Sequence, residues 1–428
     1  MATTITPQIV NLTAVVTQAP APSQLQQSGA FVSVGGSTLT SGTYQYVGDL
    51  SSANSLLSSG GNHAELADMA TTFFAQGNGV GAYVLELGTQ STPNAGVSAL
   101  SAWITNNTDI FYSYLVPENW DQPITSVSGS ISGSTLTVSS VISGTVAIGQ
   151  VVGGTGVLPS TSITAGSGTS WTVSTSGNAV TGEVLTLTNP LEILVADNSS
   201  PTSKTYFFIT STSGSIAQYS PNKAAQAYVM APTAPSTEFT AAAAFYQWLV
   251  NNPSQANPLP PMAYRYVYGV TPWPQSGQSA SVNSILTNYG NLIFTGAEGG
   301  ISTSCLFKGT TMDGQQGSWW YGVDWFQIQV KQALAAAVIN GSNSNPPLLY
   351  NQAGINALQK VAQNVGNSAV KFGCALSVVV NATPFITYTT DNPSDYNAGL
   401  YKGLSATMVG PSGFLVLDFA LDAVQFVV

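Results

Sequence analysis

The sequence predicts an α/β (α+β) protein with extended β arms at both ends and a small inserted all-β domain. Across residues 23–122 and 191–310, short apolar runs with strand character alternate with segments whose apolar residues recur at helical spacing. Between residues 123 and 190, Ser, Thr, Gly and Val dominate, and Glu183 is the only charged residue. Two long amphipathic helices follow nearer the C-terminus. A chain of 428 residues can bury a core for two or three such units.

The first α/β stretch predicts three strands and three helices. Asn62 and Glu65 have the spacing of a capping box, in which the two side chains accept hydrogen bonds from backbone amides at the start of a helix. The expected strands cover residues 31–34, 82–86 and 110–115, and the expected helices cover residues 49–57, 64–76 and 95–106.

The second stretch continues the alternation and ends in the two long helices. Strands are expected at residues 191–196, 205–210, 264–270 and 292–295, and helices at residues 221–229, 237–251 and 279–289. The long helices are expected at residues 321–340, with a buried stripe of Val323, Phe326, Val330, Leu334 and Val338, and at residues 351–365, with Ile355, Leu358, Val361 and Val365.

The composition and alternating pattern of residues 123–190 predict the inserted β domain. Short alternating runs such as STLTVSSV and TSWTVSTS recur between glycine turns. A disordered Ser/Thr-rich linker is the alternative. We favour the folded domain because regularly placed Val, Ile and Leu residues and Trp171 supply a core.

Both ends of the chain have the character of strands that pair outside a compact core. Residues 1–22 are uncharged and rich in β-branched residues until Pro20 and Pro22, and residues 413–428 form an apolar run without a breaker. Unpaired edge strands favour association with other chains, although both ends could instead pair within one subunit. The candidate interface residues are Ile5, Ile9, Val10, Leu12 and Val15 in the N-terminal arm, and Phe414, Val416, Leu417, Phe419, Val424 and Phe426 in the C-terminal arm.

Charge is scarce and unevenly distributed. Charged residues make up 6% of the chain, the net charge is -10, and the first cation is Lys204. A neutral surface of this kind suits a subunit packed against its own copies better than a monomer, with an acidic secreted protein as the alternative. Nucleic acid and anionic membranes both require clustered cations, so neither is an expected partner. No apolar window approaches the length of a membrane span.

No constellation of residues predicts catalysis. His63 is the only histidine, no lysine follows a glycine as a Walker A loop requires, and no Cys-x-x-Cys pair occurs. We therefore expect no enzyme activity, no cofactor and no metal. Cys305 and Cys374 lie among apolar neighbours and are expected to be reduced core residues. Residues 1–30 contain no cation, so no secretory signal peptide is expected and the protein should fold in a cytoplasm.

An ordered set of motifs resembles the contractile tail sheath of bacteriophages. The run MDGQQGSWWYGVDWFQIQVKQAL at residues 312–334 and the run PPLLYNQAGINALQKVAQNV at residues 346–365 follow the sheath pattern, as do TITPQIVNLTAVVTQAPAP and GAYVLELG in the first hundred residues. The residues that match the pattern most closely are Asp324, Trp325, Tyr350, Gly354 and Ile355.

The resemblance implies how the chain is divided. It implies an N-terminal arm at residues 1–22, core segments at 23–122 and 191–310, the β insertion at 123–190, a C-terminal sheath domain at 311–412 and a C-terminal arm at 413–428. The insertion is similar to small β modules that recur in phage structural proteins. Asp324 is expected in the first turn of its helix, where a carboxylate favours the helix dipole.

The resemblance also implies function and partners. Sheath subunits form stacked hexameric rings around a tail tube and contract to drive the tube through a host envelope, and their arms add strands to a neighbour's sheet. The implied partners are further copies of the chain, the tube protein, and baseplate and neck proteins, in a virion tail assembled in the host cytoplasm. Lys331, Lys360 and Lys371 are candidate contacts with an acidic tube, or simply solvated helix faces. The alternatives are another self-assembling phage protein, such as a tube or capsid subunit, and a secreted β-rich adhesin or hydrolase.

Overall fold

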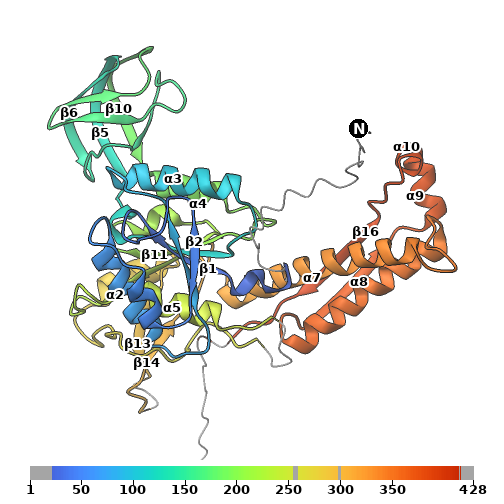
Figure 1. The fold of residues 1–428 in the computed structure, drawn as a ribbon. Coiled ribbons are helices and arrows are strands. Elements are labelled where there is room, and N and C mark those ends of the chain that lie inside the picture. Colours follow the sequence, from blue (N-terminus) through green and yellow to red (C-terminus); the bar gives the residue numbers. More distant parts are fainter. Residues whose placement is uncertain (1–21, 254–258, 297–299, 414, 416–428) are drawn as a thin grey trace, which may run out of the picture.

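The structure is a computed structural model that describes residues 22–253, 259–296, 300–413 and 415. It consists of an α/β body, a β-sheet module beside the body, and a long helical hairpin that projects from it (Figure 1). The predicted mixed α/β class is confirmed.

The body is built on a six-stranded sheet with the order β12-β11-β4-β1-β3-β2. Five of its strands are parallel, and β2 at one edge is antiparallel to β3. Parallel sheets are normally covered on both faces, which explains why β1 and β11 are buried along their whole length. The strands are β1 (Gly29–Ser33), β2 (Tyr44–Val47), β3 (Ala82–Glu86), β4 (Ser113–Leu115), β11 (Tyr206–Ser211) and β12 (Ala225–Val229).

Helices cover both faces of this sheet and create two separate cores. Successive side chains of a strand point to opposite faces, so Phe31 packs with Phe73 of α2 and Phe245 of α5, whereas Val32 belongs to the core beneath α3 and α4. The helices are α2 (His63–Phe74), α3 (Pro93–Asn106), α4 (Pro190–Asp197) and α5 (Thr240–Leu249). Shorter body elements are α1 (Leu50–Ser55), α6 (Ser279–Thr287), the antiparallel pair β13 (Leu292–Thr295) and β14 (Ser304–Phe307), and the 3₁₀ turns η1 (Pro22–Gln27), η2 (Glu118–Trp120) and η3 (Ile216–Tyr219).

Three predicted elements of the body are wrong. Residues 191–196 lie in helix α4, not in a strand, because Pro190 occupies the first helical turn and the side chain of Asn189 accepts from the Leu191 amide at 3.0 Å. Residues 225–229 form strand β12, where a helix was expected, because they pair with β11 inside the sheet. Residues 264–270 form no strand and make a single β-bridge, between Tyr266 and Cys305.

The predicted capping box is also wrong. The Asn62 side chain does not cap α2, because its oxygen accepts from the Val34 amide at 2.9 Å and its nitrogen donates to the Val32 carbonyl at 3.1 Å. Asn62 therefore ties the end of β1 to the start of α2.

Residues 125–188 form a second six-stranded sheet, fully antiparallel, with the order β7-β10-β5-β6-β9-β8. Its interior contains Val127, Leu136, Trp171 and Leu185. Thr125 of its first strand pairs with Leu187 of its last, so the chain leaves and re-enters the body at neighbouring points (Figure 1). The strands are β5 (Thr125–Gly133), β6 (Thr135–Ser143), β7 (Val151–Gly153), β8 (Ile163–Ser167), β9 (Ser170–Val173) and β10 (Asn178–Thr188).

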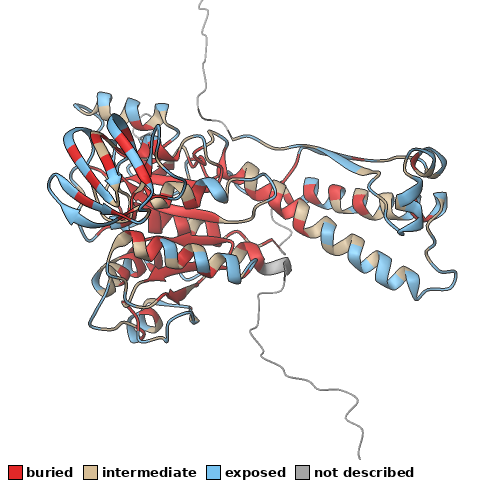
Figure 2. Cartoon of the chain, turned by 90° about the horizontal axis from the view of Figure 1, so that it is seen from above, coloured by how far each residue is buried: buried red, intermediate tan, exposed pale blue. Residues whose placement is uncertain are grey.

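The projecting hairpin contains the two long helices predicted from the sequence, α7 (Gly317–Ser342) and α8 (Gln352–Phe372). Burial is concentrated where the hairpin joins the body and decreases toward its far end (Figure 2). The chain returns through β15 (Ser377–Ala382), α9 (Phe385–Asp391), α10 (Pro393–Asn397) and β16 (Leu404–Val409), and β15 and β16 form a two-stranded antiparallel sheet. Val378 of β15 approaches α8 closely at Gly366, where an added Cβ would lie 2.7 Å from a Val378 methyl carbon.

Candidate assembly surfaces

The described residues hold no group of three or more His, Cys, Asp or Glu side chains that could bind a metal. His63 Nδ1 lies 3.1 Å from the Gly60 carbonyl oxygen, and Cys305 and Cys374 are both buried as free thiols. Within the described part of the chain, no helix is both long and apolar enough to cross a membrane.

A buried ion pair joins the hairpin to the body. Asp324 of α7 has no exposed surface, and its Oδ1 faces the Nζ of Lys223 at 3.6 Å. Its Oδ2 accepts from the hydroxyls of Tyr206 at 2.7 Å and Tyr112 at 2.9 Å. Lys223 Nζ also donates to the Ser203 carbonyl at 2.6 Å. Burial raises the pKa of Asp324 and lowers the pKa of Lys223. The attraction between the two charges partly offsets both shifts, because it lowers the pKa of Asp324 and raises that of Lys223.

The position predicted for Asp324, in the first turn of its helix, is wrong. Helix α7 begins at Gly317, so Asp324 lies two turns inside it and cannot interact with the helix N-terminus. The apolar and aromatic residues that precede Asp324 extend the helix beyond the start expected from its periodicity. Asp324 instead supplies the buried charge that fixes α7 against Tyr206 of β11 and Tyr112, the residue that precedes β4.

Trp325 also acts at the base of the hairpin. Its indole Nε1 donates to the Pro253 carbonyl at 3.0 Å, and its ring stacks on Phe372 of α8 with centroids 5.4 Å apart. Trp325 therefore contacts both the body and the second helix of the hairpin.

The other three motif residues lie at the far end of the hairpin, away from Asp324 and Trp325. The Tyr350 hydroxyl donates to the Leu400 carbonyl at 2.9 Å, and Ile355 is buried. Gly354 accepts no larger side chain, because an added Cβ would lie 1.9 Å from the Leu349 carbonyl oxygen. These residues line an apolar cavity of about 380 Å³ at the turn between α7 and α8. The five motif residues thus shape the two ends of one hairpin and do not form a single site.

The three candidate tube-contact lysines are exposed on the hairpin. Lys331 lies on α7, and Lys360 and Lys371 lie on α8. None of the three forms an ion pair with another described residue. Their charges are therefore available to a partner, which is the property that the tube-contact hypothesis requires.

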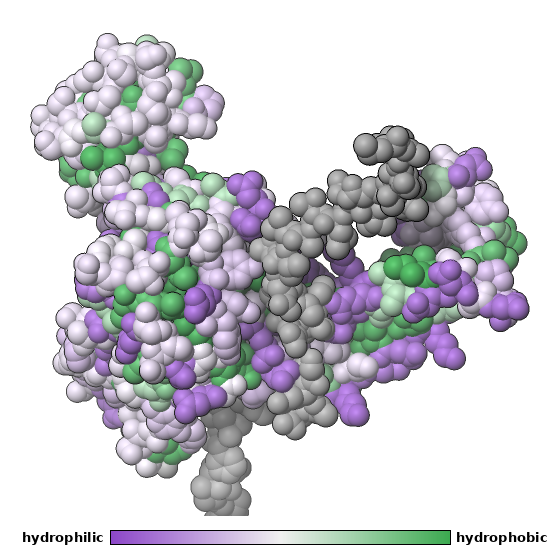
Figure 3. All heavy atoms as spheres, in the orientation of Figure 1, coloured by the Kyte–Doolittle hydropathy of each residue, from purple (hydrophilic) through white to green (hydrophobic). Residues whose placement is uncertain are grey.

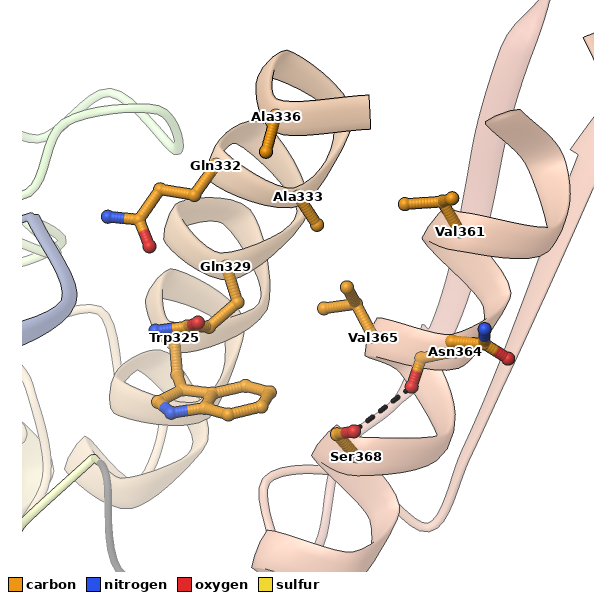
Figure 4. Close-up of a pocket in the computed structure, with 9 residues that line it drawn as sticks. All are labelled: Trp325, Gln329, Gln332, Ala333, Ala336, Val361, Asn364, Val365 and Ser368. Carbon is orange, nitrogen blue, oxygen red and sulfur yellow. Dashed lines mark hydrogen bonds between the residues drawn. The ribbon is translucent and has the colours of Figure 1, made fainter. Parts of the chain in front are cut away.

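A groove of about 610 Å³ runs between α7 and α8 (Figure 4). Figure 3 shows hydrophobic surface along the hairpin, bordered by hydrophilic residues. Sequence periodicity identified Val361 and Val365 but not the alanines that face them, because alanine contributes little to an apolar stripe. The lining residues are Trp325, Gln329, Gln332, Ala333 and Ala336 from α7, and Val361, Asn364, Val365 and Ser368 from α8.

The sheet formed by β15 and β16 is open at its β16 edge, whereas side chains of α8 cover the outer edge of β15. The Val380 amide donates to Gln363 Oε1 at 2.9 Å, and the amides of Gln359 and Gln363 donate to the Val380 and Val378 carbonyls at 2.9 and 3.0 Å. Each strand has only the other as a neighbour among the described strands. Val378 and Val380 are buried, whereas the intervening Val379 is 54% exposed. Among the described residues, the outer edge of β16 has no neighbouring strand, and an edge of this kind is suited to pairing with a further strand.

A smaller hollow lies where β1 ends and α2 and α3 begin. It has a volume of about 440 Å³ and includes Glu65, whose carboxylate accepts from the Glu118 amide at 2.6 Å. Burial raises the pKa of Glu65 to about 7, with smaller contributions from the neighbouring charges of Glu118 and Asp68.

The whole fold is similar to chains of a known contractile assembly. A chain of the anti-feeding prophage baseplate is 13% identical, with 98% of this chain and 100% of that chain covered and a TM-score of 0.55. A chain of the anti-feeding prophage helical sheath in its contracted state is 12% identical, with 98% of this chain and 100% of that chain covered and a TM-score of 0.54. The fold is that of a contractile sheath protein. No family model matches the sequence, and no curated protein matches it either.

The sheath fold confirms the resemblance carried by residues 312–334 and 346–365. The similarity in fold extends over almost the whole chain, although the sequence identity to the two anti-feeding prophage chains is low. The predicted arm residues from Ile5 to Val15 and from Phe414 to Phe426 lie outside the described residues, so their pairing stays a prediction. The predicted division into domains and arms likewise stays a prediction.

Proposed function

We propose that this chain is the subunit of a contractile tail sheath, polymerising as stacked hexameric rings around a tail tube. Contraction of the stack drives the tube through a host envelope. The observation that carries this proposal is a sheath-type fold that covers 98% of the chain and 100% of the helical-sheath chain it matches. The proposed partners are further copies of the chain, the tube protein, and baseplate and neck proteins. The proposed location is a virion tail assembled in the host cytoplasm.

We propose further that the two arms join subunits by adding strands to a neighbour's sheet. The open edge of β16, which has only β15 as a neighbour among the described strands, supports this proposal. An arm rich in β-branched residues can satisfy the free backbone groups of such an edge.

The proposed role is mechanical and not enzymatic. In this mechanism the extended stack is metastable, and subunits gain contacts as they rotate and slide outward, so contraction needs no nucleotide. The alternatives considered from the sequence, a tube or capsid protein and a secreted adhesin or hydrolase, are less favoured because the fold matches sheath and baseplate chains from end to end.

Negative-stain electron microscopy of the purified full chain at rising concentration tests the proposal. We expect rings and wide hollow tubes with transverse striations. Monodisperse monomers at every concentration, with the fold intact by circular dichroism, would contradict it.

A further inference from the structure

The groove between α7 and α8 has the chemistry of a site for an uncharged, extended peptide. Its floor is apolar, formed by Ala333, Ala336 and Val365, and no charged residue lines it (Figure 4). Gln329 and Gln332 border the groove on the α7 side, with the Gln332 amide pointing away from α8 (Figure 4), and neither amide makes a hydrogen bond with another described residue. An amide offers both a donor and an acceptor, which matches the alternating groups of an extended backbone.

The first described residues place the N-terminal segment at one end of this groove. The 3₁₀ turn η1 packs on α7, where the Gln26 side-chain amide donates to the Tyr321 carbonyl at 2.8 Å. Tyr321 lies one helical turn before Trp325, which lines the groove. The chain that precedes residue 22 therefore starts beside the Trp325 end of the groove.

The length and composition of the preceding segment fit the groove. From Trp325 to Ala336 the groove spans about 16 Å at the rise of an α-helix, which about five extended residues would cover. Residues 1–21 contain no charged side chain, and residues 11–21 read NLTAVVTQAPA. The C-terminal segment also starts near α7, at Gly413, but it contains Asp418 and Asp422, which a groove without cations would leave unpaired.

We propose that residues 11–21 lie in the α7–α8 groove of their own subunit as an extended strap. In this arrangement Leu12, Val15 or Val16 packs on the alanine floor of its own subunit. The groove directs residues 1–10 toward the far end of the hairpin, so of the candidate interface residues Ile5, Ile9 and Val10 are left to pair with a neighbour. The strap determines where the arm leaves its subunit. Only the onward pairing of residues 1–10 with a neighbour depends on the proposed sheath function.

Photo-crosslinking of the full chain tests the strap. The photoreactive residue p-benzoylphenylalanine replaces Val15, and crosslinked peptides are identified by mass spectrometry in dilute monomer. We expect crosslinks to residues 325–336 or 361–368, reduced at least fivefold by Ala333→Glu and by Ser368→Glu, which block the groove from different helices. The matched control is Ala335→Glu, on an exposed position of α7 outside the groove, which should leave the crosslinks unchanged.

Three results would overturn the strap: crosslinks that fall outside the groove, crosslinks that survive both blocking substitutions, and crosslinks that join isotopically heavy to light chains in a mixed sample. The last result would assign the segment to a neighbouring copy. Groove crosslinks in a chain that never polymerises would support the strap and contradict the sheath function, so the two proposals fail separately.

Discussion

At the scale of single residues, the buried pair of Asp324 and Lys223 determines how the hairpin is held on the body. Their charges are removed from water and compensate one another, and Tyr112 and Tyr206 satisfy one carboxylate oxygen of Asp324. Removing one member of such a pair leaves an uncompensated buried charge, which is more costly than the loss of an exposed ion pair.

We expect Asp324→Ala to lower the free energy of unfolding by about 3–5 kcal/mol. Urea denaturation followed by tryptophan fluorescence measures this loss. The control is the double variant Asp324→Ala with Lys223→Met, which removes the stranded charge and should recover part of the stability. A loss below about 1 kcal/mol in the single variant would show that the pair is not a structural anchor.

The raised pKa of Glu65 predicts that the stability of the fold depends on pH. Its pKa is about 7 in the folded chain, above the ordinary value of 4.5. Because its pKa is raised, Glu65 binds a proton more tightly in the folded state than in the unfolded state. Protonation of Glu65 therefore stabilises the fold fully below about pH 4.5, and this stabilisation is lost as the pH rises to about 7.

We therefore expect the melting temperature of the natural chain to fall between pH 5 and 7.5 more steeply than that of Glu65→Gln. Differential scanning calorimetry of both chains across this range measures the difference, and the other carboxyls contribute equally to both curves. Parallel curves would contradict the assignment to Glu65.

The roles of Trp325 and Asp324 differ in how far the sequence predicts them. Trp325 was identified by its place in a motif, and the structure gives it packing and a hydrogen bond at the base of the hairpin. The partners of Asp324 could not be predicted, because Lys223 and Tyr112 are about one hundred and two hundred positions away in the sequence. Such contacts depend on the tertiary fold, which local periodicity does not encode.

At the scale of elements, prediction succeeded where the periodic signal was long. Helices α7 and α8 were both predicted, although each extends beyond its expected bounds. The error at residues 191–196 arose because a short apolar run fits a buried strand or a helix equally well. The start signals of α4, Asn189 followed by Pro190, were present in the sequence and would have resolved the choice.

The α7–α8 hairpin also supports a prediction about the tube. The triple variant in which Gln replaces Lys331, Lys360 and Lys371 should co-assemble more weakly with an acidic tube protein, because three exposed cations are lost. The subunit fold should persist, since none of the three forms an ion pair with another described residue, and we expect ring formation to persist with it. Co-sedimentation with tubes measures capture, and electron microscopy of the same sample monitors rings. Unchanged capture at low and moderate salt would dismiss the contact.

At the scale of the whole molecule, the body, the β module and the hairpin make different contributions to the proposed assembly. The body has two apolar cores on either side of one sheet and can remain rigid while neighbouring subunits move. The hairpin offers the groove, the exposed lysines and the open edge of β16. Connections made by terminal strands would allow subunits to rotate without separating.

The most direct test of this account is a helical reconstruction by cryo-electron microscopy of tubes formed by the full chain, beside a chain that lacks residues 414–428. We predict six subunits in each ring, α7 and α8 facing the lumen, and an added strand on β16 that continues into a neighbouring subunit. The shortened chain should fold but form no tubes. Solid fibres without a lumen, or termini that pair only within their own subunit, would contradict the account.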